Sequence, residues 1–259
     1  MIIIKNPLQL AKMRSAGHLL CDVLRRTREF IRPGITTQDV NAFTDELIRK
    51  GGGIPTELGY CGYPASICAS IDDEVVHGIP SKNVALEEGS ILSVDVTLAL
   101  DGWQADSAFT APVGKISAEK EKLIRVTEEC FWKGAAAAVK ENRLGDVGWA
   151  VQAHAEQNGF SVVRDLTGHG IGRDMHEDPA VPNYGMPGHG VRLRPGMTFC
   201  IEPMINMGRW QVNQLADGWT IVTNDHLPSA HYEHTIAVTA GGQPEILTLS
   251  DEKWKGEGK

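Results

Sequence analysis

The sequence pattern predicts the same order of secondary-structure elements twice: two helices followed by strands, and then two helices followed by strands again. Apolar residues recur near helical spacing in four segments, and extended apolar runs separated by Gly and Pro turns follow each pair. Such self-similarity is typical of an internal duplication. We therefore expect an α/β (α+β) fold in a single domain with two pseudo-symmetric halves, residues 1–115 and 116–249, followed by a short polar tail.

Capping residues predict where the helices begin and end. Asn6-Pro7 is typical of a helix start, and Thr36 with Asp39 has the spacing of a capping box for a second helix. In the second half, the stretch Ser117–Val139 predicts a third helix. We expect Gly145-Asp146 to break that helix and a fourth helix to follow.

Carboxylates within apolar strand-like runs need an explanation. In each half, a turn glycine opens an extended apolar run that ends six residues on in a carboxylate, Asp95 in the first half and Glu202 in the second. Asp106 and Glu233 each lead a further short segment, so we expect every half to end in a hairpin that carries two carboxylates. Alone, each acid could face water at a sheet edge or pair with a buried arginine. Four of them, without matching strand-embedded Lys or Arg, predict that bound metal supplies the positive charge.

One histidine completes this set. His169 lies between glycines, where the backbone can approach a site closely. Carboxylates with one imidazole suit Mn, Fe(II), Co or Zn, whereas a structural zinc cage would favour cysteine. Two divalent ions about 3.5–4 Å apart would need about this many ligands. His77 and His176 also lie near glycines, where a turn or a core position explains them equally well, and the seven-residue step from His169 to His176 does not fit an HExxH zinc helix.

Composition narrows the class and the compartment. The net charge of -8 and the pI of about 5.6 argue against nucleic acid as a substrate. The five cysteines include no CxxC pair, so we expect a reducing compartment, the cytoplasm, rather than a disulfide framework. The N-terminal apolar run is three residues long, and no run approaches the roughly 20 apolar residues of a membrane span. Nothing indicates an obligate dimer, and we expect a monomer.

Five segments together carry a family resemblance. They are HGIP at 77–80, VDV around Asp95, TGHGIGRDMHEDP at 167–179, GMTFCIEPMIN at 196–206 and YEHTIAVT at 232–239. These segments resemble type I methionine aminopeptidases, the short bacterial-style form within the M24 peptidase family. The resemblance runs from the first helix to about Leu249. It implies the pita-bread fold, a pseudo-two-fold arrangement in which an antiparallel sheet is backed by helices.

The resemblance also implies an activity and a metal site. The activity is hydrolysis of the first peptide bond, which releases the initiator methionine from nascent polypeptides, with a small second residue preferred. It implies two divalent ions, Co, Mn, Fe(II) or Zn, with Asp106 and Glu233 bridging them. The implied ligands are Asp95, Asp106, His169, Glu202 and Glu233.

Further residues acquire roles only through the resemblance. Glu202 would move the proton from the attacking water to the leaving amine, and His176 would stabilise the developing oxyanion. His77 would contact the substrate backbone. Aromatic faces and a soft thiol suit a thioether side chain, and the implied pocket walls are Tyr60, Tyr63, Cys68 and Trp219.

The sequence departs from the family pattern at four positions, Cys61, Gln104, Met175 and His231. None of them is an implied ligand, so the departures leave open only the preferences for substrate and metal. Two alternative functions remain open. An X-Pro aminopeptidase or prolidase of the same fold usually carries an extra N-terminal domain, and a non-catalytic binding relative typically loses ligands. A contact with the ribosome is compatible with this interpretation, but no residue indicates it.

Overall fold

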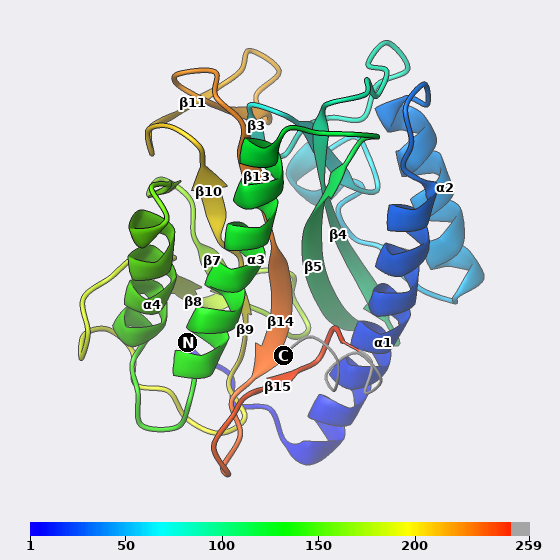
Figure 1. Cartoon of the computed structure of the whole chain (residues 1–259). Coiled ribbons are helices and arrows are strands. Elements are labelled where there is room, and N and C mark those ends of the chain that lie inside the picture. Colours follow the sequence, from blue (N-terminus) through cyan, green and yellow to red (C-terminus); the bar gives the residue numbers. More distant parts are fainter. Residues whose placement is uncertain (250–259) are drawn as a thin grey trace.

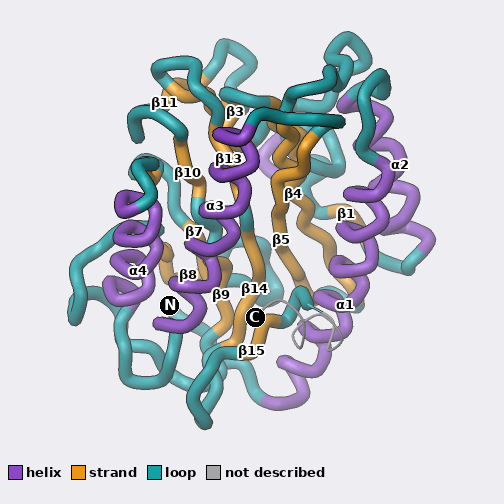
Figure 2. The backbone as a smooth tube through the Cα atoms, in the orientation of Figure 1, coloured by secondary structure: helices purple, strands orange, loops and turns teal. Residues whose placement is uncertain are grey.

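Four α-helices cover one face of a central sheet in the computed structural model, which describes residues 1–249 (Figure 1). Figure 1 shows α1 and α3 in front of the sheet, with α2 beside α1 and α4 beside α3. Figure 2 shows the same layering along the backbone, with the helices in purple and the strands in orange. The helices are α1 (Pro7–Phe30), α2 (Thr37–Lys50), α3 (Ala118–Ala137) and α4 (Leu144–Gln157), and a short 3-10 helix, η1, spans Tyr60–Gly62.

The central sheet has nine strands, and every pairing in it is antiparallel. Its main path runs β1-β4-β5-β14-β9-β7-β8, while β2 pairs with β4 and β15 with β14. Its strands are β1 (Ile54–Pro55), β2 (Cys68–Ile71), β4 (Ile91–Leu100), β5 (Trp103–Pro112), β7 (Gly168–Gly170), β8 (Glu177–Val181), β9 (Thr198–Ile201), β14 (Glu233–Ala237) and β15 (Glu245–Ile246).

Two three-stranded sheets complete the described part of the chain. One has the order β13-β10-β6 and the other β11-β12-β3. Their strands are β3 (Glu74–Val76), β6 (Ser161–Val162), β10 (Met204–Asn206), β11 (Val212–Gln214), β12 (Ile221–Thr223) and β13 (Ser229–His231).

The helix starts follow the capping residues that the sequence indicates. The side chain of Asn6 accepts the N–H of Gln9 at 3.0 Å, and the Gln9 side chain accepts the N–H of Asn6 at 2.9 Å. Thr36 and Asp39 form the same reciprocal box, and Ser117 caps α3. Each such cap stabilises a helix by about 1 kcal/mol. These three predicted starts are confirmed.

The predicted helix break at Gly145-Asp146 is wrong. The third helix ends earlier, at Ala137, and α4 already begins at Leu144, so both residues lie in its first turn. Asp146 stabilises this start because its carboxylate accepts the N–H of Arg143 at 2.7 Å. Gly145 serves close packing, since a Cβ there would lie 2.3 Å from the carbonyl oxygen of Met186.

Only one of the two expected hairpins is present. Strands β4 and β5 form it, with Asp101 and Gly102 at φ 51° and 73° between the paired residues Leu100 and Trp103. Strands β9 and β14 are antiparallel neighbours, but β10 to β13 lie between them in the sequence. The second predicted hairpin is therefore wrong, because a long insertion joins its two strands.

Apolar clusters fill the space between the helices and the central sheet. Leu20 of α1 packs with the β4 residues Leu92, Val94, Val96 and Leu98. A second cluster joins α3 and α4 to β9 and β14 through Phe131, Val151, Phe199 and Ile236. Because alternate side chains of a strand face opposite sides, the residues between these apolar ones, Asp95 among them, face away from the helices.

All five cysteines are unpaired, which agrees with the absence of a predicted disulfide framework. Within residues 1–249, no helix is both long and apolar enough to cross a membrane. The predicted polar tail lies outside the described residues.

Candidate metal centre

Neighbouring strands place three of the expected metal ligands on one face of the sheet. Ala108 of β5 pairs with Asp95 of β4 on one side and with Glu233 of β14 on the other. Asp106 precedes Ala108 by two residues in the same strand, so it faces the same side. The small side chain of Ala108, which is buried, leaves the space between these carboxylates open.

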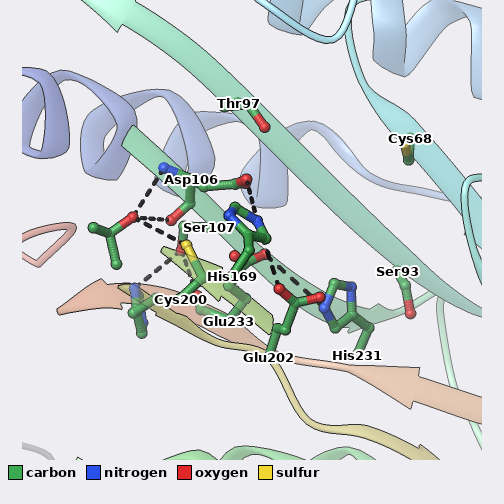
Figure 3. Close-up of polar contacts among 12 residues, drawn as sticks. Cys68, Ser93, Thr97, Asp106, Ser107, His169, Cys200, Glu202, His231 and Glu233 are labelled. Atoms are coloured by element: carbon green, nitrogen blue, oxygen red, sulfur yellow. Dashed lines mark hydrogen bonds and ion pairs between the residues drawn. The ribbon is translucent and has the colours of Figure 1, made fainter. Parts of the chain in front are cut away.

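The two remaining expected ligands come from the adjacent strands. Glu202 directly follows β9, and His169 lies in β7 next to β9. Nε2 of His169 lies 3.5 Å from Oδ2 of Asp106 and 3.6 Å from Oε1 of Glu202 (Figure 3). Nδ1 lies 3.0 Å from the carbonyl oxygen of Gly170, which can only accept a hydrogen bond. Nδ1 therefore donates, and Nε2 is the nitrogen that a metal ion would take.

The donor atoms fit a bound cation. Two ligands about 2.1 Å from one ion in tetrahedral geometry are about 3.4 Å apart, close to the two spacings around His169. Each of the four acids has one buried oxygen without a hydrogen-bond partner among the described residues: Oδ1 of Asp95 and Asp106, and Oε1 of Glu202 and Glu233. Unpartnered buried carboxylates are costly, so the site requires positive charge.

Without metal, protons would fill this need. Burial and the charge of Asp106 raise the pKa values of Asp95 and Glu233 well above their ordinary range. Burial raises the pKa of Glu202 to about 8. Burial alone would lower the pKa of His169, but Asp106 and Glu202 outweigh it and raise the pKa to about 9. A divalent ion would displace these protons.

All eleven residues expected at the site line one cavity of about 330 Å³. Within it, Nδ1 of His176 lies 2.7 Å from the hydroxyl of Tyr60, and the His176 and His169 ring centroids are 4.1 Å apart. Burial and the neighbouring His169 lower the pKa of His176 to about 4, and burial lowers the pKa of His77. His77 and His176 are therefore neutral hydrogen-bonding groups at pH 7.

The expected side-chain pocket lies beside the carboxylates. Cys68 of β2 pairs directly with Asp95 of β4. The hydroxyl of Tyr63 donates to the carbonyl of Gly78 at 2.9 Å, and the Tyr63 ring meets Trp219 edge-on at a centroid distance of 5.0 Å. These contacts fix aromatic and sulfur surfaces next to the carboxylate cluster, where an apolar side chain could be held.

Glu57, which no sequence pattern indicated, also lines the cavity. Its Oε1 accepts the hydroxyl of Thr97 at 3.0 Å, and its Oε2 lies 3.8 Å from Sγ of Cys68. Burial and the charge of Asp106 raise the pKa of Glu57 to about 8. Glu57 follows a two-residue strand in a loop without periodicity, so no pattern marks it in the sequence.

Cys200 is buried beside the expected ligands. Its Sγ lies within 4.8 Å of ligand atoms of Asp106, His169 and Glu233. Sγ also lies 3.6 Å from Oγ1 of Thr235. Cys200 therefore borders the carboxylate cluster rather than a purely apolar core.

The four departures from the family pattern lie in different surroundings. Cys61 is exposed in η1, with φ 46°. Gln104 lies away from the cavity, and its N–H donates to the carbonyl of Gly172 at 2.8 Å. Met175 is buried and lines the cavity, whereas His231 is buried beside Glu233. Two of the four departures can therefore influence the site directly.

Comparisons with known proteins agree with this arrangement. Residues 11–240 match the sequence model of Metallopeptidase family M24, and the chain belongs to this family. It is similar to methionine aminopeptidase from Clostridium perfringens, with 50% identity over 249 residues that cover 96% of this chain and 99% of that protein. It is also similar to methionine aminopeptidase 1 from Bacillus subtilis, with 46% identity over 248 residues, 96% of this chain and 99% of that protein.

A solved structure extends the comparison to three dimensions. The crystal structure of methionine aminopeptidase from Thermotoga maritima superposes with a TM-score of 0.94 at 45% identity, covering 96% of this chain and 100% of that one. The predicted family and the predicted pita-bread α/β fold are thereby confirmed.

Proposed function

We propose that this chain is a metal-dependent methionine aminopeptidase that hydrolyses the first peptide bond of polypeptides beginning with methionine. One observation carries the proposal: five potential ligands, four of them with orphaned buried oxygens, converge beside a pocket walled by aromatic rings and sulfur. The relatives named above, at 46% to 50% identity over nearly their whole length, support this activity over the X-Pro and non-catalytic alternatives.

The proposed cofactor is a pair of divalent ions. Asp106 and Glu233 lie on neighbouring strands at the centre of the cluster, where they would bridge the ions, with Asp95, His169 and Glu202 as outer ligands. Two bound ions would lower the pKa of a water molecule and polarise the carbonyl of the peptide. The oxygen-rich set with one imidazole is compatible with Co, Mn, Fe(II) and Zn.

The chain's own residues would hold and move protons. The carboxylate of Glu202 would take a proton from the attacking water and return it to the leaving amine. The hydroxyl of Tyr60, 2.7 Å from Nδ1 of neutral His176, would donate to it, so that Nε2–H would be left to stabilise the oxyanion. His77 would donate to the substrate backbone. Tyr60, Tyr63, Cys68 and Trp219 would surround the methionine side chain.

The setting of this reaction is proposed as well. The substrates would be the N-termini of nascent polypeptides in the cytoplasm, with a small second residue preferred. We propose that the chain acts as a monomer and as one catalytic domain with two halves, residues 1–115 and 116–249. No described residue indicates how a contact with the ribosome would be made.

Release of free methionine from Met-Ala-Ser tests the proposal. Chelator-stripped protein receives Co, Mn, Fe(II) or Zn, with Glu202→Ala as the matched control and an X-Pro peptide as the competing substrate. We expect metal-dependent release that is lost in Glu202→Ala, and no cleavage of X-Pro. Folded protein that releases no methionine with any metal would refute the activity, and cleavage of X-Pro alone would favour the alternative peptidase.

A further inference from the structure

The imidazole of His231 has no hydrogen-bond partner among the described residues. Its side chain is 2% exposed, and neither Nδ1 nor Nε2 forms a hydrogen bond within residues 1–249. A buried polar group left in this state costs about 1–3 kcal/mol. The ring therefore requires a partner other than the surrounding side chains, and it lies beside a cluster that requires cations.

The backbone fixes the direction of this ring. His231 ends β13 and Glu233 begins β14, so these alternate residues of an extended chain face the same side. The intervening Tyr232 instead packs with Phe131 and His234 on the helix side of the sheet. Thr110 holds the backbone in place, because its hydroxyl accepts the N–H of His231 at 2.9 Å and donates to the His231 carbonyl at 2.9 Å.

The distance between the two side chains suits a shared ion. Nε2 of His231 lies 4.0 Å from Oε2 of Glu233, which is too long for a hydrogen bond. Two bonds of about 2.0–2.2 Å from one ion can span up to about 4.2 Å, so both atoms can bind the same ion. Figure 3 shows this contact as a dashed line between the His231 ring and Glu233.

We propose that His231 is a further ligand of the metal centre and binds, through Nε2, the ion that Glu233 holds. The inference rests on the proposed metal site but not on the peptidase reaction. A second imidazole changes the donor balance, because imidazole suits Zn, Fe and Co whereas carboxylates suit Mn and Mg. His231 would therefore shift the preference of one ion from Mn towards Zn or Co.

Calorimetric titration of the chelator-stripped protein with Zn and with Mn measures this preference. We expect His231→Gln to weaken one Zn-binding step about tenfold or more, and Mn binding less than threefold. His234→Gln is the matched control. It changes a buried histidine of the same segment, but the His234 ring packs against Phe131 and Tyr232 on the helix side of the sheet. Equal losses for Zn and Mn, or the same losses in His234→Gln, would contradict the proposal.

X-ray absorption of the Zn-loaded wild-type protein gives a second test that needs no variant. We expect two imidazole ligands per two ions, from His169 and His231. One imidazole per two ions would overturn the inference even if His231→Gln fails to fold. The outcome is independent of the proposed activity: a protein with two imidazole ligands that releases no methionine would refute the peptidase and leave His231 as a ligand.

Discussion

The hydrogen bond between Tyr60 and His176 joins a pocket wall to a proposed catalytic group. Tyr60 lies in η1, while His176 lies in the loop before β8. Their separation of 2.7 Å is a hydrogen-bond distance that holds the imidazole in one orientation, and with the Tyr60 hydroxyl as donor the imidazole proton would be on Nε2. In the proposed reaction, Tyr60 would therefore act through His176 as well as through the pocket.

Removal of this hydroxyl should reduce turnover. We expect Tyr60→Phe to lower kcat about tenfold with little change in KM, because the ring still lines the pocket while His176 loses its orientation. Steady-state kinetics on Met-Ala-Ser measures both constants. Tyr184→Phe serves as the control, since Tyr184 lies outside the cavity. A Tyr60→Phe variant that changes only KM would assign Tyr60 to the pocket alone.

Single residues show which parts of the site the sequence reveals. Asp95 and Glu202 stand out because carboxylates are rare in apolar strands, and His169 because glycines flank it. Glu57 does not stand out, since its place beside Thr97 and Cys68 results from the tertiary fold. The sequence likewise cannot show that the His231 ring lacks hydrogen-bond partners, because this depends on how the strands pair.

At the scale of elements, a buried ion pair between Lys5 and Glu177 joins the start of the chain to β8, directly after the loop that carries His176. Nζ of Lys5 lies 2.5 Å from Oε2 of Glu177, and the two side chains are 2% and 4% exposed. The other oxygen of Glu177 accepts the N–H of Arg173 at 2.9 Å. This pair therefore holds the segment from β7 to β8, next to His176.

Breaking the pair from one side should be costly. We expect Lys5→Met to lower the free energy of unfolding by about 3–5 kcal/mol, because Glu177 remains buried without a counter-charge. Arg14→Met is the matched control: it removes the Arg14–Glu245 pair, whose side chains are 39% and 34% exposed, and should cost about 1 kcal/mol or less. Denaturant unfolding compares the two variants, and similar losses would show that burial of the first pair is unimportant.

The elements also show where prediction from the sequence ends. Helix starts are predictable because Asn6, Thr36 and Ser117 make their capping bonds within three residues. The position of Gly145 depends on the carbonyl of Met186, which is far away in the sequence, and the β9–β14 pairing spans a long insertion. Local sequence therefore predicts capping bonds between near neighbours, but it does not predict packing or strand pairing between distant residues.

For the whole molecule, the acidic cluster couples stability to pH and metal. In the metal-free protein, the pKa of Glu202 rises from 4.5 to about 8 and that of His169 from 6.5 to about 9. Between pH 6.5 and 8 the folded state therefore holds protons that the unfolded state has lost. Its free energy of unfolding must fall as pH rises through this window. His176, with its pKa lowered to about 4, acts in the opposite direction only below pH 6.5.

Thermal unfolding of the metal-free protein from pH 6.5 to 8 measures this dependence. We expect the midpoint to fall with pH, and less steeply in Glu202→Gln, which lacks one of these titrating groups. Metal at about 100 times its dissociation constant should stabilise the fold by about 2.7 kcal/mol, or about 5–10 °C. A metal-free midpoint that is constant or rises over this range would contradict the proton-filled cluster.

The proposed ligands come from separate parts of the chain, Asp95 and Asp106 from the β4–β5 hairpin and the other three from β7, from the residue after β9 and from β14. Neither group alone has enough donors for two ions. The seam between β5 and β14 is therefore also the seam of the metal site, and a small widening of it would release the ions while every helix stays folded. Metal affinity would therefore report how tightly those two strands are paired. A distant substitution that loosens the pairing would first appear as weaker metal binding, so that a lower concentration of chelator would remove the metal.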